Sequence, residues 1–556
     1  MKQGIRDQCT TPMMVAAVAA SLVFQMGCTS SPAVNPAPQT KAATQPPKAG
    51  VGTTKTGGDG KAATKGKDAG SATDNTQTLD NLVNPWLKRP EIQHSFVGVE
   101  VMELPSGKVL FSSNGNRRFA PASTTKIITC ACAYSTLGAG FTYSTKLFAE
   151  GNTANDTILG DLVLMPGQDP SLSRDDLAQL LSSVNKRKIR KVNGTLKLAP
   201  TPGGNDDFES SWLIEDFGQE YSPVASNLVI DRNIAEGITP LRGSRTVIQH
   251  GNDCTNALER SLLNSEVAAG WLTYVPSGHE LRGFIGNGVT EKSPLPVSDP
   301  DEYNTALALD ILQGQGVTVS RTEGGGNADI LIAEHLSQPL PIILKHTLHK
   351  SDNLYSQQLL RTLGLPAPSK DGKPAKPQAS AALEDIGLAR IGHWLNSIGV
   401  PSQEAVMFDG CGLSRKNGIS PHALNTVLKF MAGPKVDGSF LGLLRESGTA
   451  TRKGQFFFKT GSMDTVRSIS GVLGTAGGQQ LAVTIIINDH TQNIKNLGGT
   501  LTELISLLNE ITSINFVMSK PNQPSEEKVV IQMTKPSPGG VSYGRHPRTR
   551  TRRRRH

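Results

Sequence analysis

Alternating hydrophobic and polar residues mark a hairpin near the start of the folded part of the chain. Residues 96–104 read FVGVEVMEL, in which apolar and polar positions alternate as in a strand with one buried face. The tripeptide PSG at 105–107 supplies turn residues, and KVLFSS at 108–113 returns. The pattern therefore predicts two antiparallel strands over residues 96–113.

Further segments carry helix and strand patterns. PASTTKIITCACAYSTLG, at 121–138, suits a helix that begins near Ser123 and stops at Gly138. LYSQQLLRTLG, from Leu354, suits a second helix. Near the end of the chain, QFFFKTG, VRSISGVL and QLAVTIIIN read as three strands, and the turn between the last two falls at 477–478. These three segments predict an antiparallel meander.

The first 28 residues resemble an export signal. Two basic residues precede an apolar stretch from Met13 to Phe24, and Gly27-Cys28 resembles a lipoprotein cleavage site that would lipidate Cys28. Gln25 stands where such sites favour an aliphatic residue, so lipidation stays open beside simple cleavage and an uncut membrane anchor. We expect export to the periplasm or cell envelope.

Charge and composition separate the two ends from the body. Residues 29–79 contain no aromatic residue and are rich in Ala, Thr, Gly, Lys and Pro, which predicts a disordered tether. We expect a disordered basic tail over 517–556, ending in RHPRTRTRRRRH, either as a solvated end or as a contact for anionic surfaces. The net charge of +8 arises at these ends. The body is slightly acidic, which argues against a basic nucleic-acid-binding domain.

The body has the composition of a folded protein. Of 556 residues, 37% are hydrophobic, and no apolar run of the length of a membrane span lies within the body, so a polytopic membrane protein is disfavoured. Six cysteines are too few for a disulfide scaffold, and Cys130 and Cys132 point to different faces of one helix. His346 and His349 form an isolated HxxH that we interpret as structural. We expect no metal and no cofactor.

A serine and a lysine three residues apart are the first candidate for chemistry. Ser123 and Lys126 share one face of the predicted helix. A neutral Lys126 amine could take the hydroxyl proton of Ser123, and burial or a second nearby cation would lower the lysine pKa enough for this role. The same spacing occurs at Ser183 and Lys186, in a polar stretch, so spacing alone is a weak signal.

Two more short motifs follow in a fixed order. Ser351 and Asn353 stand at the start of the second helix, and Lys459-Thr460-Gly461 ends the first strand of the meander. A second KTG begins at Lys55, within the tether and without a strand around it. Order and structural context, rather than any single motif, indicate one site.

The order SxxK, SxN, KTG resembles the penicillin-recognising serine hydrolases. The long gap between the first two motifs resembles the D-alanyl-D-alanine carboxypeptidase/endopeptidase family of class C low-molecular-mass penicillin-binding proteins, in which domains are inserted there. GDLVLMPGQDPSLSRDDL, YSPVASNL and DGCGLSRKNGISP agree, over about residues 85–515. Where the family typically reads DGSGLS, this chain has Cys411, which we expect to alter a loop at the site rim slightly.

The resemblance implies a multi-domain α/β (α+β) fold. Its catalytic domain would be β-lactamase/transpeptidase-like, with an antiparallel sheet flanked by helices, formed by residues 80–144 and about 291–516. Residues 145–290 would form a large strand-rich insertion. The first 28 residues, the tether at 29–79 and the tail at 517–556 would lie outside it.

The resemblance also implies roles for individual residues in cutting D-Ala-D-Ala bonds of peptidoglycan peptides. Ser123 would attack the carbonyl with Lys126 as base, and the backbone N–H groups of Ser123 and Ser462 would bind the oxyanion. Ser351, oriented by Asn353, would pass the proton to the leaving amine. Substrate binding would fall to the following residues: Lys459, Thr460, Gly461, Ser462 and, through the amino group of the stem peptide, Asp169.

Such an enzyme would bind β-lactam antibiotics as covalent inhibitors. Two alternatives stay open. A β-lactamase would need a dedicated base for fast deacylation, and no short Glu-bearing loop replaces the long insertion. A catalytically inactive peptidoglycan-binding protein would not need the intact motifs.

Overall fold

The structure is a computed structural model that describes residues 76–200, 208–235, 245–250, 270–275, 280–285, 294–320, 328–366, 382–434, 436, 438–447, 454–491, 494–518 and 527–533. The export signal with Cys28, the tether up to residue 75, Cys254 and the end of the basic tail lie outside the described residues. Among the described helices, none has the length and hydrophobicity that a bilayer crossing requires.

A six-stranded sheet of order β19-β20-β21-β22-β2-β3 forms the centre of the part of the chain that carries the three motifs, and all of its neighbouring strands are antiparallel. Its strands are β2 (Phe96–Leu104), β3 (Val109–Ser113), β19 (Arg445–Glu446), β20 (Phe456–Met463), β21 (Val466–Gly474) and β22 (Gln480–Asn488). The predicted hairpin and the predicted meander are both confirmed, and with them the mixed fold built on an antiparallel sheet.

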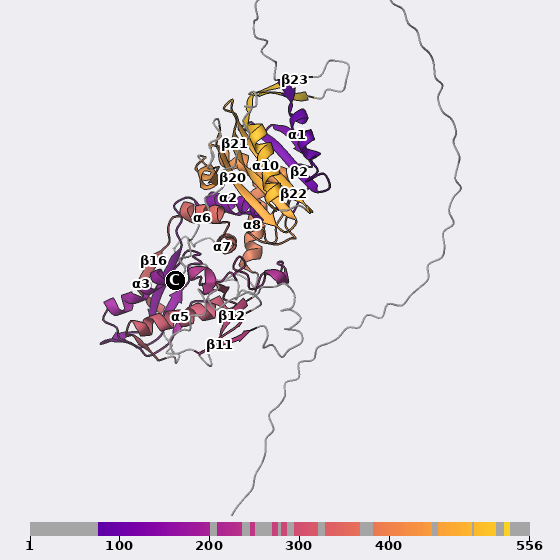
Figure 1. Cartoon of the computed structure of the whole chain (residues 1–556). Helices are drawn as coiled ribbons and strands as arrows, with labels where there is room; N and C mark the ends of the chain where they lie inside the picture. Colours follow the sequence, from indigo (N-terminus) through magenta and orange to yellow (C-terminus); the bar gives the residue numbers. More distant parts are fainter. Residues whose placement is uncertain are drawn as a thin grey trace, which may run out of the picture. The chain divides into compact units, whose positions relative to one another are not determined.

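Helices cover both faces of this sheet. Successive side chains of β22 point to opposite faces, and almost all of them are buried. Val483, Ile485 and Ile487 enter a core shared with α1 and α10, whereas Ala482 and Ile486 enter a second core on the opposite face. Figure 1 shows α10 lying across the sheet. The first face is covered by α1 (Leu79–Leu87) and α10 (Ile494–Asn509), and the second by α2 (Thr125–Leu137), α6 (Leu340–Lys350), α7 (Asn353–Gly364), α8 (Leu383–Ser397) and α9 (Pro421–Ala432).

Helix α2 carries the first motif and is buried along most of its length. A single turn of 3-10 helix, η1 (Ala122–Thr124), leads into it, and Gly138 ends it with a φ of 82°. This agrees with the predicted helix from near Ser123 to Gly138. Cys130 and Cys132 are buried and free, so the prediction that they do not pair is confirmed.

The inserted part begins at β4 (Ser144–Glu150) and ends at β16 (Ala328–Leu336), which pair with each other antiparallel. The pair is extended by β7 (Leu162–Met165) and β9 (Leu196–Leu198), giving the order β16-β4-β7-β9. Apolar side chains of α3 (Arg174–Lys186) and α5 (Pro300–Gly314) complete its core.

Shorter elements complete the described chain. A second small sheet has the order β15-β8-β6-β5, comprising Thr318–Val319, Lys191–Val192, Thr157–Ile158 and Thr153–Ala154. A third has the order β11-β13-β12, comprising Arg245–His250, Glu280–Ile285 and Gly270–Val275. Two pairs remain, β10 (Ile234–Ala235) with β14 (Leu295–Pro296) and β17 (Ala405–Val406) with β18 (Gly418–Ile419). The other 3-10 turns are η2 (Ile214–Asp216), η3 (Asp231–Asn233) and η6 (Ser439–Leu443).

Three expected boundaries differ in the structure. The tether was expected to be disordered up to residue 79, but β1 (Thr76–Thr78) is a paired strand and α1 begins at Leu79. The insertion, expected to end near residue 290, reaches Leu336, because α5 and β16 pack in its core rather than against the central sheet. The tail, expected to be disordered from residue 517, contains β24 (Glu527–Met533), which pairs with both β23 (Ile511–Met518) and β1 (Thr76–Thr78). Val529 and Ile531 alternate and are buried, so this short segment does form a strand.

Arg361 of α7 joins the helix to the inserted part. Its guanidinium is fully buried and donates to Gln168 Oε1 at 3.0 Å, to Asn227 Oδ1 at 2.9 Å and to Glu384 Oε1 at 2.6 Å. The acceptors distribute the charge of a buried cation that would otherwise be costly. Helix α7, which begins with the second motif, is therefore positioned by both parts of the protein.

Burial in the central sheet predicts the effect of a cavity there. Ile485→Ala removes a fully buried side chain from β22 and should lower the free energy of unfolding by about 2–5 kcal/mol. Ile342→Ala removes the same atoms from a side chain that is 54% exposed and should change it by less than about 0.5 kcal/mol. Denaturant unfolding of both variants, followed by circular dichroism, measures the difference. Equal losses in the two variants would contradict the assignment of this core.

Candidate active site

Ser123 and Lys126 meet where η1 passes into α2. Lys126 Nζ lies 3.0 Å from Ser123 Oγ, so the two groups are within hydrogen-bond distance. Lys126 is fully buried, whereas Ser123 is partly exposed. The arrangement leaves the hydroxyl reachable from solvent and encloses the amine behind it.

The second motif stands at the N-terminus of α7 and contacts the first. Asn353 Oδ1 accepts a hydrogen bond from Lys126 Nζ at 2.6 Å, and Asn353 Nδ2 donates to the backbone oxygen of Tyr221 at 2.8 Å. Ser351 adopts a left-handed conformation with a φ of 60°. Asp352 caps the helix by accepting from the backbone N–H of Tyr355. Of the two neighbours of Asp352, Asn353 reaches the first motif through Lys126.

The third motif lies on β20, and its residues alternate in and out. Lys459 and Gly461 are buried, whereas Thr460 and Ser462 are exposed. Lys459 Nζ donates to Ser351 Oγ at 2.9 Å, which connects the third motif to the second. A Cβ at Gly461 would lie 2.9 Å from the backbone nitrogen of Ser123, so the strand passes directly against the serine turn. The structure thus brings together the residues of all three motifs.

Burial controls the protonation of the two lysines. Desolvation lowers the pKa of Lys126 below its ordinary value. Desolvation, followed by the positive charges of Lys126 and Arg445, lowers the pKa of Lys459 well below the ordinary value. Burial therefore lowers the pKa of Lys126, as expected. The repulsion between the two lysines lowers mainly the pKa of Lys459.

The backbone carbonyl of Cys411 is a third acceptor for Lys126 Nζ, at 2.7 Å. A neutral amine has two N–H donors, which Asn353 Oδ1 and this carbonyl can both engage. The nitrogen lone pair then remains for the hydroxyl proton of Ser123. The three contacts therefore fix the position of Lys126 Nζ beside Ser123 Oγ.

Asp409 shapes the loop that supplies this carbonyl. Its carboxylate accepts from the backbone N–H groups of Cys411, Gly412 and Ser414 and from the indole of Trp212, at 2.6–3.2 Å. We expected Cys411 to lie in a loop at the rim of the site. It is instead fully buried and lies beneath the site, behind Lys126. Sequence reasoning missed this carbonyl because every residue carries one, although the DGCGLS segment was a signal that the loop matters.

The remaining sequence candidates lie elsewhere. Asp169 is 2% exposed and bonds within its own loop to Ser171 N and Oγ, and burial raises the pKa of its carboxyl. No interaction described for it reaches Ser123, so its role in binding the stem peptide stays a prediction. Ser183 and Lys186 lie in the last turns of α3, in the inserted part, and the KTG at Lys55 is outside the described residues.

The two histidines of the HxxH pattern have separate partners. His346 Nε2 lies 3.3 Å from Asp352 Oδ2, and His349 Nε2 lies 3.1 Å from the carbonyl of Leu444. Within the described part of the chain, no three His, Cys, Asp or Glu residues cluster in a way that could bind a metal ion.

Comparison with known proteins decides the family. The model of the D-Ala-D-Ala carboxypeptidase 3 (S13) family matches residues 79–504. The chain belongs to this family. It is a serine-type carboxypeptidase, and the resemblance based on its three motifs is confirmed.

Relatives of this carboxypeptidase are similar over most of its length. It is 27% identical to a D-alanyl-D-alanine carboxypeptidase of Actinomadura sp. (strain R39) over 74% of this chain and 80% of that protein. It is 25% identical to penicillin-sensitive carboxypeptidase A of Dictyostelium discoideum over 82% of this chain and 95% of that protein. The fold is similar to that of penicillin binding protein 4 (dacB) from Haemophilus influenzae, with a TM-score of 0.59 at 22% identity, covering 76% of this chain and 97% of that one. A second structure of that protein, complexed with a β-lactam, gives 0.56 at 21% identity over the same shares.

Close packing at Gly461 predicts the result of adding a methyl group there. In Gly461→Ala the new Cβ would lie 2.6 Å from Pro121 O and 2.9 Å from Ser123 N, so the strand and the serine turn must separate. We expect kcat/KM of the carboxypeptidase to fall about a hundredfold, because small displacements of reacting groups are costly. Gly442→Ala, with no atom within 4 Å of its Cβ, is the matched control and should keep the wild-type rate. Wild-type activity of Gly461→Ala would refute the contact.

Proposed function

We propose that this carboxypeptidase cleaves D-Ala-D-Ala bonds of peptidoglycan stem peptides through an acyl-enzyme on Ser123. The observation that carries the proposal is the buried amine of Lys126, which lies 3.0 Å from Ser123 Oγ and also contacts Asn353 and Cys411. A hydroxyl becomes a nucleophile when a neutral base accepts its proton, and burial favours the neutral form of a lysine.

Acylation then follows from the arrangement of the groups. Ser123 Oγ attacks the carbonyl of the penultimate D-Ala while Lys126 accepts the hydroxyl proton. The backbone N–H groups of Ser123 and Ser462 bind the developing oxyanion. Gly461, packed against the serine turn, supports this role because it places the end of β20 beside Ser123.

Departure of the terminal D-Ala requires a proton and a binding site for its carboxylate. Ser351, which accepts from Lys459 Nζ, is the group that passes the proton to the leaving amine. Lys459 and the exposed hydroxyl of Thr460 bind the carboxylate. Water releases the acyl group afterwards. An endopeptidase reaction at a cross-link uses the same groups, because it also cleaves an amide beyond a D-Ala.

The surroundings of the reaction follow from this substrate. Peptidoglycan lies outside the cytoplasm, so the proposal includes export through the segment at residues 1–28 and action in the periplasm or cell envelope. The β-lactam ring offers Ser123 a strained amide, which supports covalent inhibition by these antibiotics. Lipidation of Cys28 and contact of the Arg-rich end with anionic surfaces remain part of the proposal.

Covalent labelling tests the nucleophile. A fluorescent penicillin should label the full chain stably, and Ser123→Ala should abolish the label because it removes the attacking oxygen. Ser183→Ala, which alters the other SxxK segment, is the matched control and should label like the wild type. Failure of the folded wild-type protein to label would favour the inactive peptidoglycan-binding alternative, and rapid loss of the label would favour a β-lactamase. Release of D-Ala from a pentapeptide then establishes the reaction.

The pH dependence tests the base. Lys126 acts only when neutral, so the acylation rate should rise with pH and level off above a pKa that burial has lowered from 10.5. Lys126→Arg introduces a guanidinium that stays protonated, and we expect acylation to slow about a hundredfold or more at every pH. Stopped-flow labelling over a range of pH measures both effects. A flat profile in the wild type, or an active Lys126→Arg variant, would exclude Lys126 as the base.

A further inference from the structure

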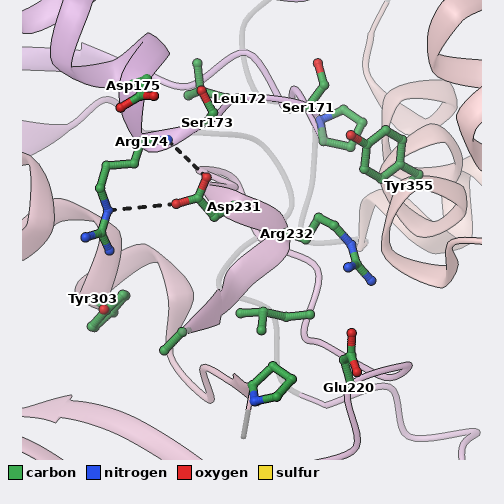
Figure 2. Close-up of a pocket in the computed structure, with 14 residues that line it drawn as sticks. Ser171, Leu172, Ser173, Arg174, Asp175, Glu220, Asp231, Arg232, Tyr303 and Tyr355 are labelled. Atoms are coloured by element: carbon green, nitrogen blue, oxygen red, sulfur yellow. Dashed lines mark hydrogen bonds and ion pairs between the residues drawn. The ribbon is translucent and has the colours of Figure 1, made fainter. Parts of the chain in front are cut away.

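A cleft of about 750 Å³ lies in the inserted part, against the side of α7 (Figure 2). Its walls come from the loop before α3, from η3 and β10, from α5, and from α7 itself. The lining includes the following side chains: Arg174, Asp175, Glu220, Asp231, Arg232, Tyr303 and Tyr355. This volume is typical of sites that bind small molecules. None of the three catalytic motifs contributes a lining residue.

Two opposite charges face the cleft without pairing with each other. Figure 2 shows the side chains of Arg232 and Glu220 directed into it. Arg232 Nε lies 2.7 Å from Asp352 Oδ2, and the side chain remains 37% exposed. Among the contacts of the described residues, none joins Arg232 to Glu220. By contrast, Arg174 lies beside Asp231 and donates its backbone N–H to the same carboxylate, so these two charges offset each other.

The turn that carries Arg232 is strained and firmly supported. Asp231, Arg232 and Asn233 all have positive φ, between 48° and 62°. The buried side chain of Asn233 donates to Val224 O at 2.8 Å and to Ser226 Oγ at 3.0 Å, and accepts from Asn304 at 3.0 Å. Three adjacent non-glycine residues in this conformation persist only where the surroundings enforce it, as at ligand sites. The backbone of the turn is therefore held in place, and the guanidinium at its centre is held by Asp352.

We propose that this cleft binds a short zwitterionic peptide, namely the trimmed stem peptide left after D-Ala release. Its carboxylate engages Arg232 and its ammonium group engages Glu220, while Tyr303 and Tyr355 contact the body of the peptide. The identity of this ligand rests on the proposed function. The two charges that face the cleft are observed independently of that function. A ligand with both charges matches Arg232 and Glu220, which do not pair with each other, better than an anion or a cation alone would.

The start of α7 contacts Arg232 directly and contacts Tyr221, the residue after Glu220, and these contacts couple the cleft to Ser123. Arg232 pairs with Asp352, the cap of the helix. Glu220 precedes Tyr221, whose carbonyl accepts from Asn353 Nδ2. A bound carboxylate competes with Asp352 for Arg232, which loosens the cap and displaces Asn353 from Lys126. Occupancy of the cleft therefore slows the chemistry at Ser123.

The first test measures binding with the active site blocked. The full chain is acylated with a slowly released penicillin and titrated calorimetrically with the tetrapeptide L-Ala-γ-D-Glu-L-Lys-D-Ala. We expect saturable binding, weakened at least tenfold in Arg232→Gln and in Glu220→Gln and weakened likewise when the terminal carboxylate of the peptide is amidated. Lys191→Gln removes an exposed charge elsewhere in the inserted part and should bind like the wild type.

The outcomes separate the two proposals. A wild-type protein that takes no penicillin label contradicts the proposed function, whereas an acylated protein that binds no tetrapeptide overturns the present inference. Unchanged affinity in both cleft variants also overturns it. Penicillin labelling of each variant shows that it is folded. If Arg232→Gln does not fold, the affinity of Glu220→Gln decides the test.

The second test measures coupling. Saturating tetrapeptide should slow release of the acyl group from Ser123 about fivefold, at the lower end of ordinary coupling between sites. At a peptide concentration that half-saturates the wild type, the slowing should be much smaller in Glu220→Gln, which binds the peptide at least tenfold more weakly. A release rate that does not respond to the peptide would refute the coupling between the cleft and α7.

Discussion

The burial of one lysine amine sets the requirements for the whole active site. A buried amine is costly unless each of its hydrogens and its lone pair finds a partner. Lys126 finds its partners in Ser123, Asn353 and the carbonyl of Cys411, which come from three distant segments of the chain. The central sheet, its helices and the loop at Asp409 must all be in place before these groups converge. Catalytic geometry and correct folding are therefore the same condition in this protein.

Much of the site could be predicted because its side chains lie on regular elements. The three-residue spacing of Ser123 and Lys126 matches a helical turn, and the alternation around Lys459 matches a strand, so local pattern defined local geometry. The carbonyl of Cys411 could not be found this way, because its position depends on the donors around the Asp409 carboxylate, which only the folded chain assembles.

The end of the insertion was missed for a related reason. Helix α5 presents apolar residues that would suit either core, and nothing local to Leu307 or Leu312 tells which sheet they cover. The choice is made by tertiary pairing, in which β16 lies beside β4. Strand β24 was missed because only two of its residues, Val529 and Ile531, show the alternating burial of a strand. They lie next to a highly polar segment of the sequence.

The small sheet formed by β1, β24 and β23 has a mechanical consequence. Thr76 pairs with Gln532, so the first and last described strands leave the folded body at one place. A pulling force on the N-terminal side would act first on the three paired residues of β1, and would peel this strand from β24 before strain reached the central sheet. Tension at that end would thus be released at the periphery, leaving the register of β20 against Ser123 unchanged.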